Sequence, residues 1–354
     1  MIMKDLVIGC ITDYDFDKIK PWVNSLCRSG FEGTKAMICY NVGYETVEEL
    51  VKRDFTIFAF GKNENQKRLE YKENFSIVVE RFFHLWYFLK KYKGQYRYIV
   101  TTDVKDVVFQ SDPIKWLENN IGDKQINVAC ESIRYEDESW GNNNLLKSFG
   151  PVIHEHNKNN LIYNAGTISG QFDTMLDFFL NIYMVCQGTS QFIEGGGGPD
   201  QAALNILLNM KPYKDITNFA MSEDGYAAQL GTTGPQKYIE YDSKLVENVP
   251  LLNRDTVYTS TNKMFTIVHQ YDRIPEWKKI IEEKKKEIQT YLQTVKQELR
   301  EGNIDLVVEI QSKNIKPRME YIQHLQYQQL NLHKFDVSKN FIGDLSVGNL
   351  FYTF

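Results

Sequence analysis

The chain has 354 residues, of which 42% are hydrophobic, 25% charged and 13% aromatic, and its formal net charge is −5. This length allows one large domain or two modest ones, and the composition is typical of a globular protein with a sizeable core. The negative charge argues against nucleic acid as the main partner, because phosphate backbones need a basic surface.

The five cysteines are odd in number, irregularly spaced and without a Cys-x-x-Cys pair. This pattern predicts reduced thiols in a cytoplasmic compartment, not a disulfide framework or a zinc site. The first residues contain no apolar run after a basic segment, so we expect no signal peptide. A membrane-spanning helix needs about 18 uninterrupted apolar residues, and no apolar segment of the sequence approaches this length, so we expect no membrane span.

The first third of the chain alternates short apolar runs with segments of helical periodicity. Strands are predicted at 6–11, 36–40, 56–60 and 98–102, and helices at 19–27, 47–51 and 75–92. Strands that alternate with helices predict an α/β fold, with a mostly parallel central sheet flanked by helices on both faces. On the helix at 75–92, Arg81 interrupts the apolar surface. It is interpreted first as a surface group and second as a phosphate or nucleotide contact.

The pattern changes in the middle of the chain. Strands are predicted at 127–130 and 161–170, and helices at 172–186 and 200–208. Residues 136–160 are polar and show little periodicity, which predicts a lid or binding loop. Four consecutive glycines, 195–198, indicate mobility first and a phosphate cradle second, because no Gly-Lys-Ser/Thr follows. From Trp277 onward the chain is highly charged, and we expect 276–354 to form mainly helical segments for packing or self-association into a homo-oligomer.

The most informative stretch surrounds the fourth predicted strand. This strand is apolar and runs directly into Asp103, Asp106 and Asp112. Open α/β sheets bind ligands at the carboxyl ends of their strands, and clustered carboxylates repel one another unless a cation lies between them. Oxygen ligands suit Mg²⁺ or Mn²⁺, which commonly carries a diphosphate. The alternative is a plain strand-to-turn boundary, since Asp is a favoured turn residue.

Taken together, four stretches resemble the glycosyltransferases of the GT-A fold, especially the families related to glycogenin and to the bacterial lipooligosaccharide galactosyltransferases. They are Thr12-Asp13-Tyr14, Asp103 to Asp106, Asn164-Ala-Gly166 with Asp200-Gln201-x-x-x-Asn205, and His269 followed by Trp277. They occur in the family's order. The resemblance implies a GT-A-like catalytic domain over residues 1–275, with the helical extension 276–354 outside it.

The resemblance also implies roles for the residues that match. The expected metal ligands are Asp103, Asp106 and His269, for Mn²⁺ or Mg²⁺, and the matching nucleotide contacts are Thr12, Asp13 and Tyr14. The matching sugar contacts are Asn164, Gly166, Asp200 and Gln201, of which Asp200 and Gln201 are also catalytic candidates. Outside the matching motifs, the residues themselves add the basic side chains of Arg81 and Lys105 as nucleotide contacts and the acid Glu131 as a catalytic candidate. Lys105 departs from the family pattern, because an acid usually stands two residues after the first Asp. Either Asp106 is the second ligand, which we favour, or Lys105 replaces part of the metal's charge and makes the enzyme metal-independent.

The function implied is transfer of a sugar from a nucleotide-diphosphate sugar, with UDP-sugars favoured, to a hydroxyl of a glycan or other acceptor. By resemblance the reaction would be metal-assisted and retaining and would serve glycan biosynthesis; Asp200 or Glu131 as the general base of an inverting reaction is the alternative. An inactive nucleotide- or glycan-binding scaffold is a second class of function, suggested by Lys105. A haloacid-dehalogenase-like phosphohydrolase is a third, suggested by Asp13-Tyr14-Asp15 but weakened by Asp17.

Overall fold

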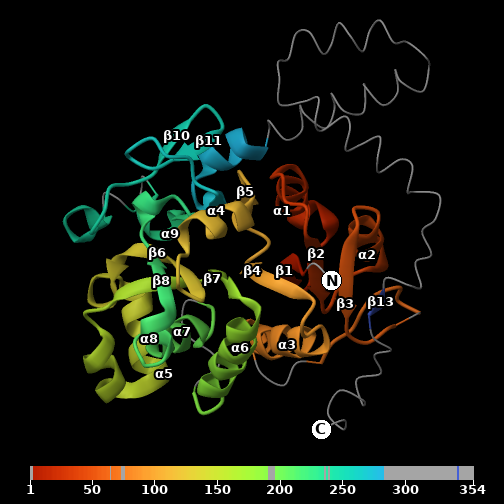
Figure 1. Cartoon of the computed structure of the whole chain (residues 1–354), viewed down its shortest axis with the longest axis horizontal. Coiled ribbons are helices and arrows are strands. Elements are labelled where there is room, and N and C mark those ends of the chain that lie inside the picture. The colour runs from red at the N-terminus through yellow and green to blue at the C-terminus, as the bar shows by residue number, and fades with distance from the viewer. Residues whose placement is uncertain are drawn as a thin grey trace, which may run out of the picture.

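A computed structural model describes residues 3–63, 65–72, 76–189, 196–234, 237 and 240–282, together with the backbone of 341–342. Its centre is an eight-stranded sheet of order β13-β3-β2-β1-β4-β7-β6-β8 (Figure 1). These strands are β1 (Lys4–Ile11), β2 (Thr34–Cys39), β3 (Phe55–Ala59), β4 (Tyr96–Thr102), β6 (Ile126–Arg134), β7 (Leu161–Gln171), β8 (Thr217–Ala220) and β13 (Phe341–Ile342). All neighbours pair in parallel except β7, which is antiparallel to both β4 and β6. The predicted α/β fold with a mostly parallel sheet is confirmed.

Helices cover both faces of this sheet (Figure 1). One face carries α1 (Phe16–Arg28), α2 (Tyr44–Val51) and α4 (Pro113–Asn120), and the other carries α3 (Ile77–Lys91), α6 (Phe172–Cys186) and α7 (Asp200–Leu208). Strand β1 shows the reason, because Leu6 and Ile8 belong to the core under α3 and α6, whereas Val7 and Ile11 belong to the core under α1 and α2. Successive side chains of a strand point to opposite faces, so an uninterrupted apolar strand needs cover on both.

A smaller sheet stands at the carboxyl end of β4. It consists of β5 (Val107–Phe109), β12 (Ile267–His269) and β9 (Ala227–Gln229), in the order β5-β12-β9. Strand β12 is antiparallel to β5 and parallel to β9, and this register aligns His269 with Val107 on one side and with Gln229 on the other. The remaining elements are α5 (Ser139–Asn157), α8 (Tyr213–Ile216), α9 (Leu230–Thr233), and the hairpin of β10 (Leu251–Asn253) and β11 (Thr256–Tyr258).

The lid or loop predicted for residues 136–160 is wrong, because most of this segment is helix α5. Glu138 caps its first turn by accepting from Trp140 N at 3.2 Å and from Gly141 N at 2.5 Å. Gly150, with φ at 77°, breaks the helix just before Pro151. The kink divides the apolar stripe into two short pieces, so no single helical period runs through the segment.

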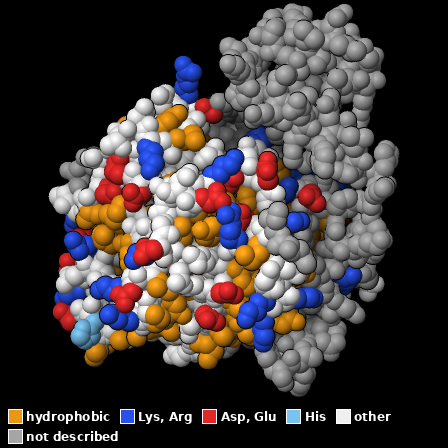
Figure 2. Space-filling model, viewed as in Figure 1, with side chains coloured by type: hydrophobic (Ala, Val, Ile, Leu, Met, Phe, Trp, Pro, Cys, Tyr) orange, Lys and Arg blue, Asp and Glu red, His pale blue; other side chains and the backbone are white. Residues whose placement is uncertain are grey.

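The other elements predicted before residue 275 are found within a few residues of their expected limits. All five cysteines are free thiols. Within the described residues, no helix combines the length and apolar content needed to cross a membrane. Figure 2 shows acidic and basic side chains interspersed on one face of the molecule. The predicted helical extension is described only as far as residue 282, and the rest of it lies outside the described residues, apart from the backbone of β13.

Candidate active site

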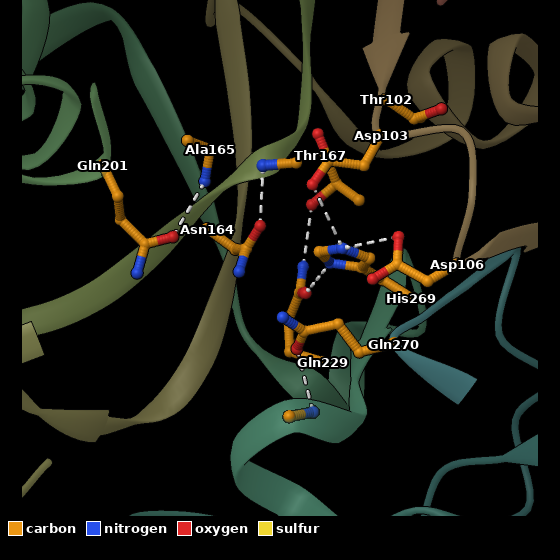
Figure 3. A network of polar contacts seen from close by, with 12 residues as sticks. Thr102, Asp103, Asp106, Asn164, Ala165, Thr167, Gln201, Gln229, His269 and Gln270 are labelled. Carbon is orange, nitrogen blue, oxygen red and sulfur yellow. Dashed lines mark hydrogen bonds and ion pairs between the residues drawn. The ribbon is translucent and has the colours of Figure 1, made fainter. Parts of the chain in front are cut away.

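Two carboxylates and an imidazole meet at the end of β4 (Figure 3). Asp103 directly follows β4, Asp106 ends the turn into β5, and His269 is the last residue of β12. The Nε2 atom of His269 lies 3.5 Å from Asp103 Oδ2 and 3.6 Å from Asp106 Oδ1. The structure therefore brings together the three residues expected to bind a metal.

The imidazole of His269 is oriented by Gln229, at the end of β9. Gln229 Nε2 donates to Thr167 Oγ1 at 2.7 Å, so Gln229 Oε1 faces His269 Nδ1, also at 2.7 Å, and accepts a hydrogen bond from the ring N–H. With Nδ1 as donor, the neutral ring keeps its lone pair on Nε2, which points toward the two carboxylates. This Nε2 atom is buried and has no hydrogen-bond partner among the described residues. One imidazole nitrogen and two carboxylates form a donor set that suits Mn²⁺ or Mg²⁺.

The charges in this cluster compensate one another. Burial opposes ionisation of Asp103, but Arg81 and His269 outweigh burial and hold the pKa of Asp103 well below its usual range. Burial also disfavours the charged form of His269, yet Asp106 and Asp103 raise its pKa above the ordinary value. Burial raises the pKa of Asp106. The same carboxylates that favour a proton on the ring would favour a divalent cation beside it.

The turn after β4 directs the side chains of Lys105 and Asp106 to different places. Val104 is buried against Gly9, where a Cβ would lie 2.5 Å from Val104 Cγ2. With Val104 turned inward, Lys105 faces outward, and its Nζ lies 3.8 Å from Asp272 Oδ2. The turn thus returns Asp106, and not Lys105, to the cluster.

Strand β7 forms the floor beside these residues. Gly166 O accepts from Asp103 N at 2.9 Å, and a Cβ on Gly166 would lie 2.6 Å from Asp103 Oδ2 and 2.7 Å from His269 Cε1. Any larger residue at this position would fill the space next to the cluster. Asn164 is held on both sides, because its Oδ1 accepts from Gly166 N at 2.6 Å and its Nδ2 donates to Glu131 Oε1 at 2.6 Å.

Helix α7 packs against this floor and brings the acid Asp200 to the site. Asn205 Oδ1 accepts from Tyr163 N at 2.8 Å, and Asn205 Nδ2 donates to Tyr163 O at 2.8 Å. Gln201 Oε1 accepts from Ala165 N at 3.3 Å. Asp200, the first residue of α7, is buried, and burial raises its pKa although a neighbouring guanidinium opposes the shift.

That guanidinium belongs to Arg81, which lies inside the site. Its Nη1 donates to Asp103 Oδ1, and its Nη2 donates to Asp200 Oδ2 at 3.0 Å and to Ala165 O at 3.3 Å. Its side chain is 15% exposed, so the interpretation of Arg81 as a surface group is wrong. The carboxylates of Asp103 and Asp200 compensate the buried charge of Arg81. Both lie far from Arg81 along the chain, so the sequence spacing did not identify either of them as its partner.

Glu131 is a buried acid near the end of β6, and Asn164 Nδ2 donates to it. Burial raises the pKa of Glu131 to about 7. A carboxyl with this pKa can take up or release a proton near neutral pH, which is the property a general acid or base needs.

A cavity of about 430 Å³ opens over these groups. This volume lies within the roughly 300–1,000 Å³ of small-molecule sites. Eight residues expected from the sequence line it: Arg81, Asp103, Glu131, Asn164, Gly166, Asp200, Gln201 and His269. Asp106 belongs to the adjoining cluster, and the other expected residues, Thr12, Asp13, Tyr14 and Lys105, are not in the cavity wall.

The segment expected to bind the nucleotide, 12–14, lies at the end of β1 next to the acidic cluster. Tyr14 is half-buried, and burial together with the neighbouring acids raises its pKa. Asp13 is exposed, has φ at 54° and lies 3.5 Å from Arg68. The roles of these residues and of Lys105 as nucleotide contacts stay predictions.

The site also contains residues that the sequence reasoning missed. Gln229 orients the imidazole, and Gln270, Arg273, Trp140 and Lys237 line the cavity. Arg273 is exposed, and no carboxylate of the described residues lies at ion-pair distance from it. Gln229 carried a usable signal, because it ends an apolar strand as the expected ligands do. Neither periodicity nor spacing marks Trp140 or Lys237.

The fold and site together define an α/β protein with a candidate divalent-cation centre at the carboxyl end of its sheet. No protein-family model and no curated protein matches the sequence. Among solved structures, the chain is similar to the apo form of the glycosyltransferase GlyE from Streptococcus pneumoniae TIGR4, with 13% sequence identity and a TM-score of 0.45. The similarity covers 76% of this chain and 54% of that chain, so this chain spans about half the length of that protein. The likeness concerns the backbone alone.

Proposed function

We propose that the protein is a metal-assisted glycosyltransferase that uses a nucleotide-diphosphate sugar, with UDP-sugars favoured. The observation that carries this proposal is the meeting of Asp103, Asp106 and the unpartnered Nε2 of His269 beside a polar cavity. The partners would be the nucleotide-sugar donor and a glycan acceptor.

The reaction breaks the bond between the sugar carbon and the diphosphate oxygen and forms a bond from that carbon to the acceptor oxygen. The diphosphate leaves with the electron pair, and the acceptor hydroxyl loses its proton. A divalent cation held by Asp103, Asp106 and His269 would offset the charge on the leaving diphosphate. Arg273 lines the same cavity and would supply a further positive charge for that group.

The donor sugar would be oriented by the polar groups of β7 and α7. The Asp200 carboxylate and the Arg81 guanidinium, 3.0 Å apart, offer an acceptor and a donor for sugar hydroxyls. Asn164 and Gln201 hold the wall behind them through their bonds to the β7 backbone. A fixed set of hydrogen-bonding groups orients a substrate and selects among hydroxyl configurations.

The stereochemical course follows from the face of the sugar carbon that the acceptor attacks. Attack opposite the diphosphate inverts the configuration and needs a base to take the acceptor proton, whereas attack on the same face retains it and lets an oxygen of the leaving diphosphate take the proton. Our proposal is retention of configuration, in line with the family that the sequence resembles. Glu131 supports the inverting alternative, since it is buried in the cavity wall and its pKa of about 7 suits a general base. The anomeric configuration of the isolated product distinguishes the two.

Calorimetric titration with a panel of nucleoside diphosphates, with and without Mn²⁺, tests the proposal, and donor hydrolysis without acceptor measures the activity. We expect Mn²⁺-dependent binding of one diphosphate and slow hydrolysis of its sugar conjugate. Gln229→Leu leaves His269 without its orienting partner and should weaken Mn²⁺ affinity about tenfold to 100-fold. The control is Asp123→Asn, an exposed acid that does not line the cavity. Absence of nucleotide binding under every condition would defeat the proposal.

A further inference from the structure

One wall of the cavity has no role in the reaction described so far. We define it as the Trp140 wall, formed by Trp140, Glu138, Lys237 and the glycines 196–198. We propose that Trp140 is the stacking platform for a saccharide acceptor and thereby sets the acceptor class. This inference rests on the proposed function and deepens it.

The side chain of Trp140 is available to a ligand. It lies in the first turn of α5, is half-buried, and lines the same cavity as Asp103 and His269. Its backbone is fixed, because Trp140 N donates to the capping carboxylate of Glu138 at 3.2 Å. No hydrogen bond of its indole N–H occurs among the described residues. With its backbone held in this way, the indole offers an apolar surface and, at its edge, an N–H that has no partner among the described residues.

The glycines beside it keep this part of the cavity open. A Cβ on Gly197, whose φ is +81°, would lie 3.1 Å from Trp140 Cζ2, and a Cβ on Gly198 would lie 2.6 Å from Val78 Cγ2. Gly198 O accepts from Asn144 Nδ2 at 3.0 Å, which ties the segment to α5. Larger residues here would occupy the space between α3 and α5 in front of the indole.

The other polar groups of the Trp140 wall are already engaged. Glu138 accepts from Gly141 N and from Tyr241 Oη at 3.3 Å, in addition to Trp140 N. Lys237 Nζ lies 2.6 Å from Glu240 Oε2 and 5.2 Å from the Tyr241 ring centre. Trp140 is therefore the group of this wall that can recognise a ligand.

A sugar ring fits this arrangement better than a peptide or a lipid. Its C–H face can lie on the indole while its hydroxyls turn to the polar groups across the cavity. Those groups include Glu131 and Gln270, neither of which is assigned to the donor sugar. The nucleotide base is expected at 12–14, outside the cavity wall, and the donor sugar at Arg81 and Asp200, so neither part of the donor is assigned to Trp140.

Two variants, Trp140→Ala and Trp140→Phe, test the proposal. Sugar transfer to a panel of mono- and disaccharides is compared with donor hydrolysis in the same samples. We expect Trp140→Ala to raise the acceptor KM and to lower the ratio of transfer to hydrolysis about tenfold, whereas Trp140→Phe, which keeps an aromatic face, retains most of the ratio. Val152→Ala, an exposed position on the same helix, is the control and should leave the ratio unchanged.

A readout independent of turnover is the indole fluorescence of the full chain with nucleoside diphosphate and Mn²⁺ bound. Saccharide addition should change the emission of the wild type and not that of Trp140→Phe. An unchanged ratio in Trp140→Ala, an equal loss of transfer and hydrolysis, or transfer to peptides alone would overturn the proposal while leaving glycosyltransferase activity in place. A wild-type chain that binds no nucleoside diphosphate would instead show failure of the proposed function itself.

Discussion

Among the single residues of the site, Glu131 links the protonation of a candidate catalytic group to the stability of the fold. Burial raises the pKa of its carboxyl from about 4.5 to about 7. Below pH 4.5 the group is protonated in the folded and the unfolded chain, and its contribution to stability is fully present. As the pH rises to 7, the unfolded chain releases the proton while the folded chain keeps it, so stability is lost across this window.

We predict that Glu131→Gln removes this loss. The free energy of unfolding of the variant, relative to wild type, should be higher at pH 8 than at pH 4.5 by about 3 kcal/mol. Urea denaturation at the two pH values measures the difference, and any constant effect of the new amide cancels in it. Glu276→Gln, on an exposed carboxyl, is the control. Equal pH dependence in wild type and Glu131→Gln would contradict the prediction.

At the scale of elements, the site depends on how α7 is attached to β7. The pairing of β6 and β7 shifts register between Cys130 and Arg134, where Tyr163 lies opposite Cys130. Asn205 of α7 supplies partners for both backbone groups of Tyr163. The side chain thus replaces ladder hydrogen bonds that the irregular strand cannot make, and it holds α7, with Asp200 at its start, over the floor.

We predict that Asn205→Ala lowers the free energy of unfolding by about 2 to 3 kcal/mol, because it leaves buried backbone groups without partners. It should also weaken nucleotide-sugar binding, since the position of Asp200 depends on α7. Chemical denaturation and calorimetric titration measure the two effects. Asn209→Ala, one turn further along and half-buried, removes a single bond to Asn205 O and should cost less than half as much. Similar losses in both variants would contradict this account.

At the scale of the whole molecule, the described residues form four hydrophobic cores. The hydrophobic clusters on the two faces of the sheet, under the small sheet and beside α5 draw their members from between Leu6 and Ile281. The small sheet completes the site, because it carries His269 and Gln229. Strand β3 pairs with β2 on one side and with β13 on the other, so its pairing with β2 does not involve β13.

We therefore predict that a chain ending after Glu282 unfolds cooperatively and keeps the donor-hydrolysis activity of the full chain within about threefold, because it retains every core residue of the described part of the chain. Thermal unfolding and the hydrolysis assay measure this. A chain ending after Met264, which lacks β12, is the contrasting variant and should lose both. Loss of cooperative unfolding in the longer chain would show that the extension belongs to the same folding unit.

The sequence by itself determined six strands of the main sheet (β1 to β4, β6 and β7), the helices α1, α2, α3, α6 and α7, the two-sided cover of the sheet and the three candidate ligands. These features are local, because apolar runs and helical periods report burial directly, and polar residues at strand ends mark the edge where ligands bind. The sequence did not predict the kinked helix α5, because Gly150 and Pro151 interrupt its helical periodicity. Only the tertiary structure decided that Arg81 bridges Asp103 and Asp200, that Gln229 orients His269, and that Trp140 faces the cavity. Such pairings join residues far apart in the chain, and no spacing along it records which charges and rings will meet once the sheet has closed.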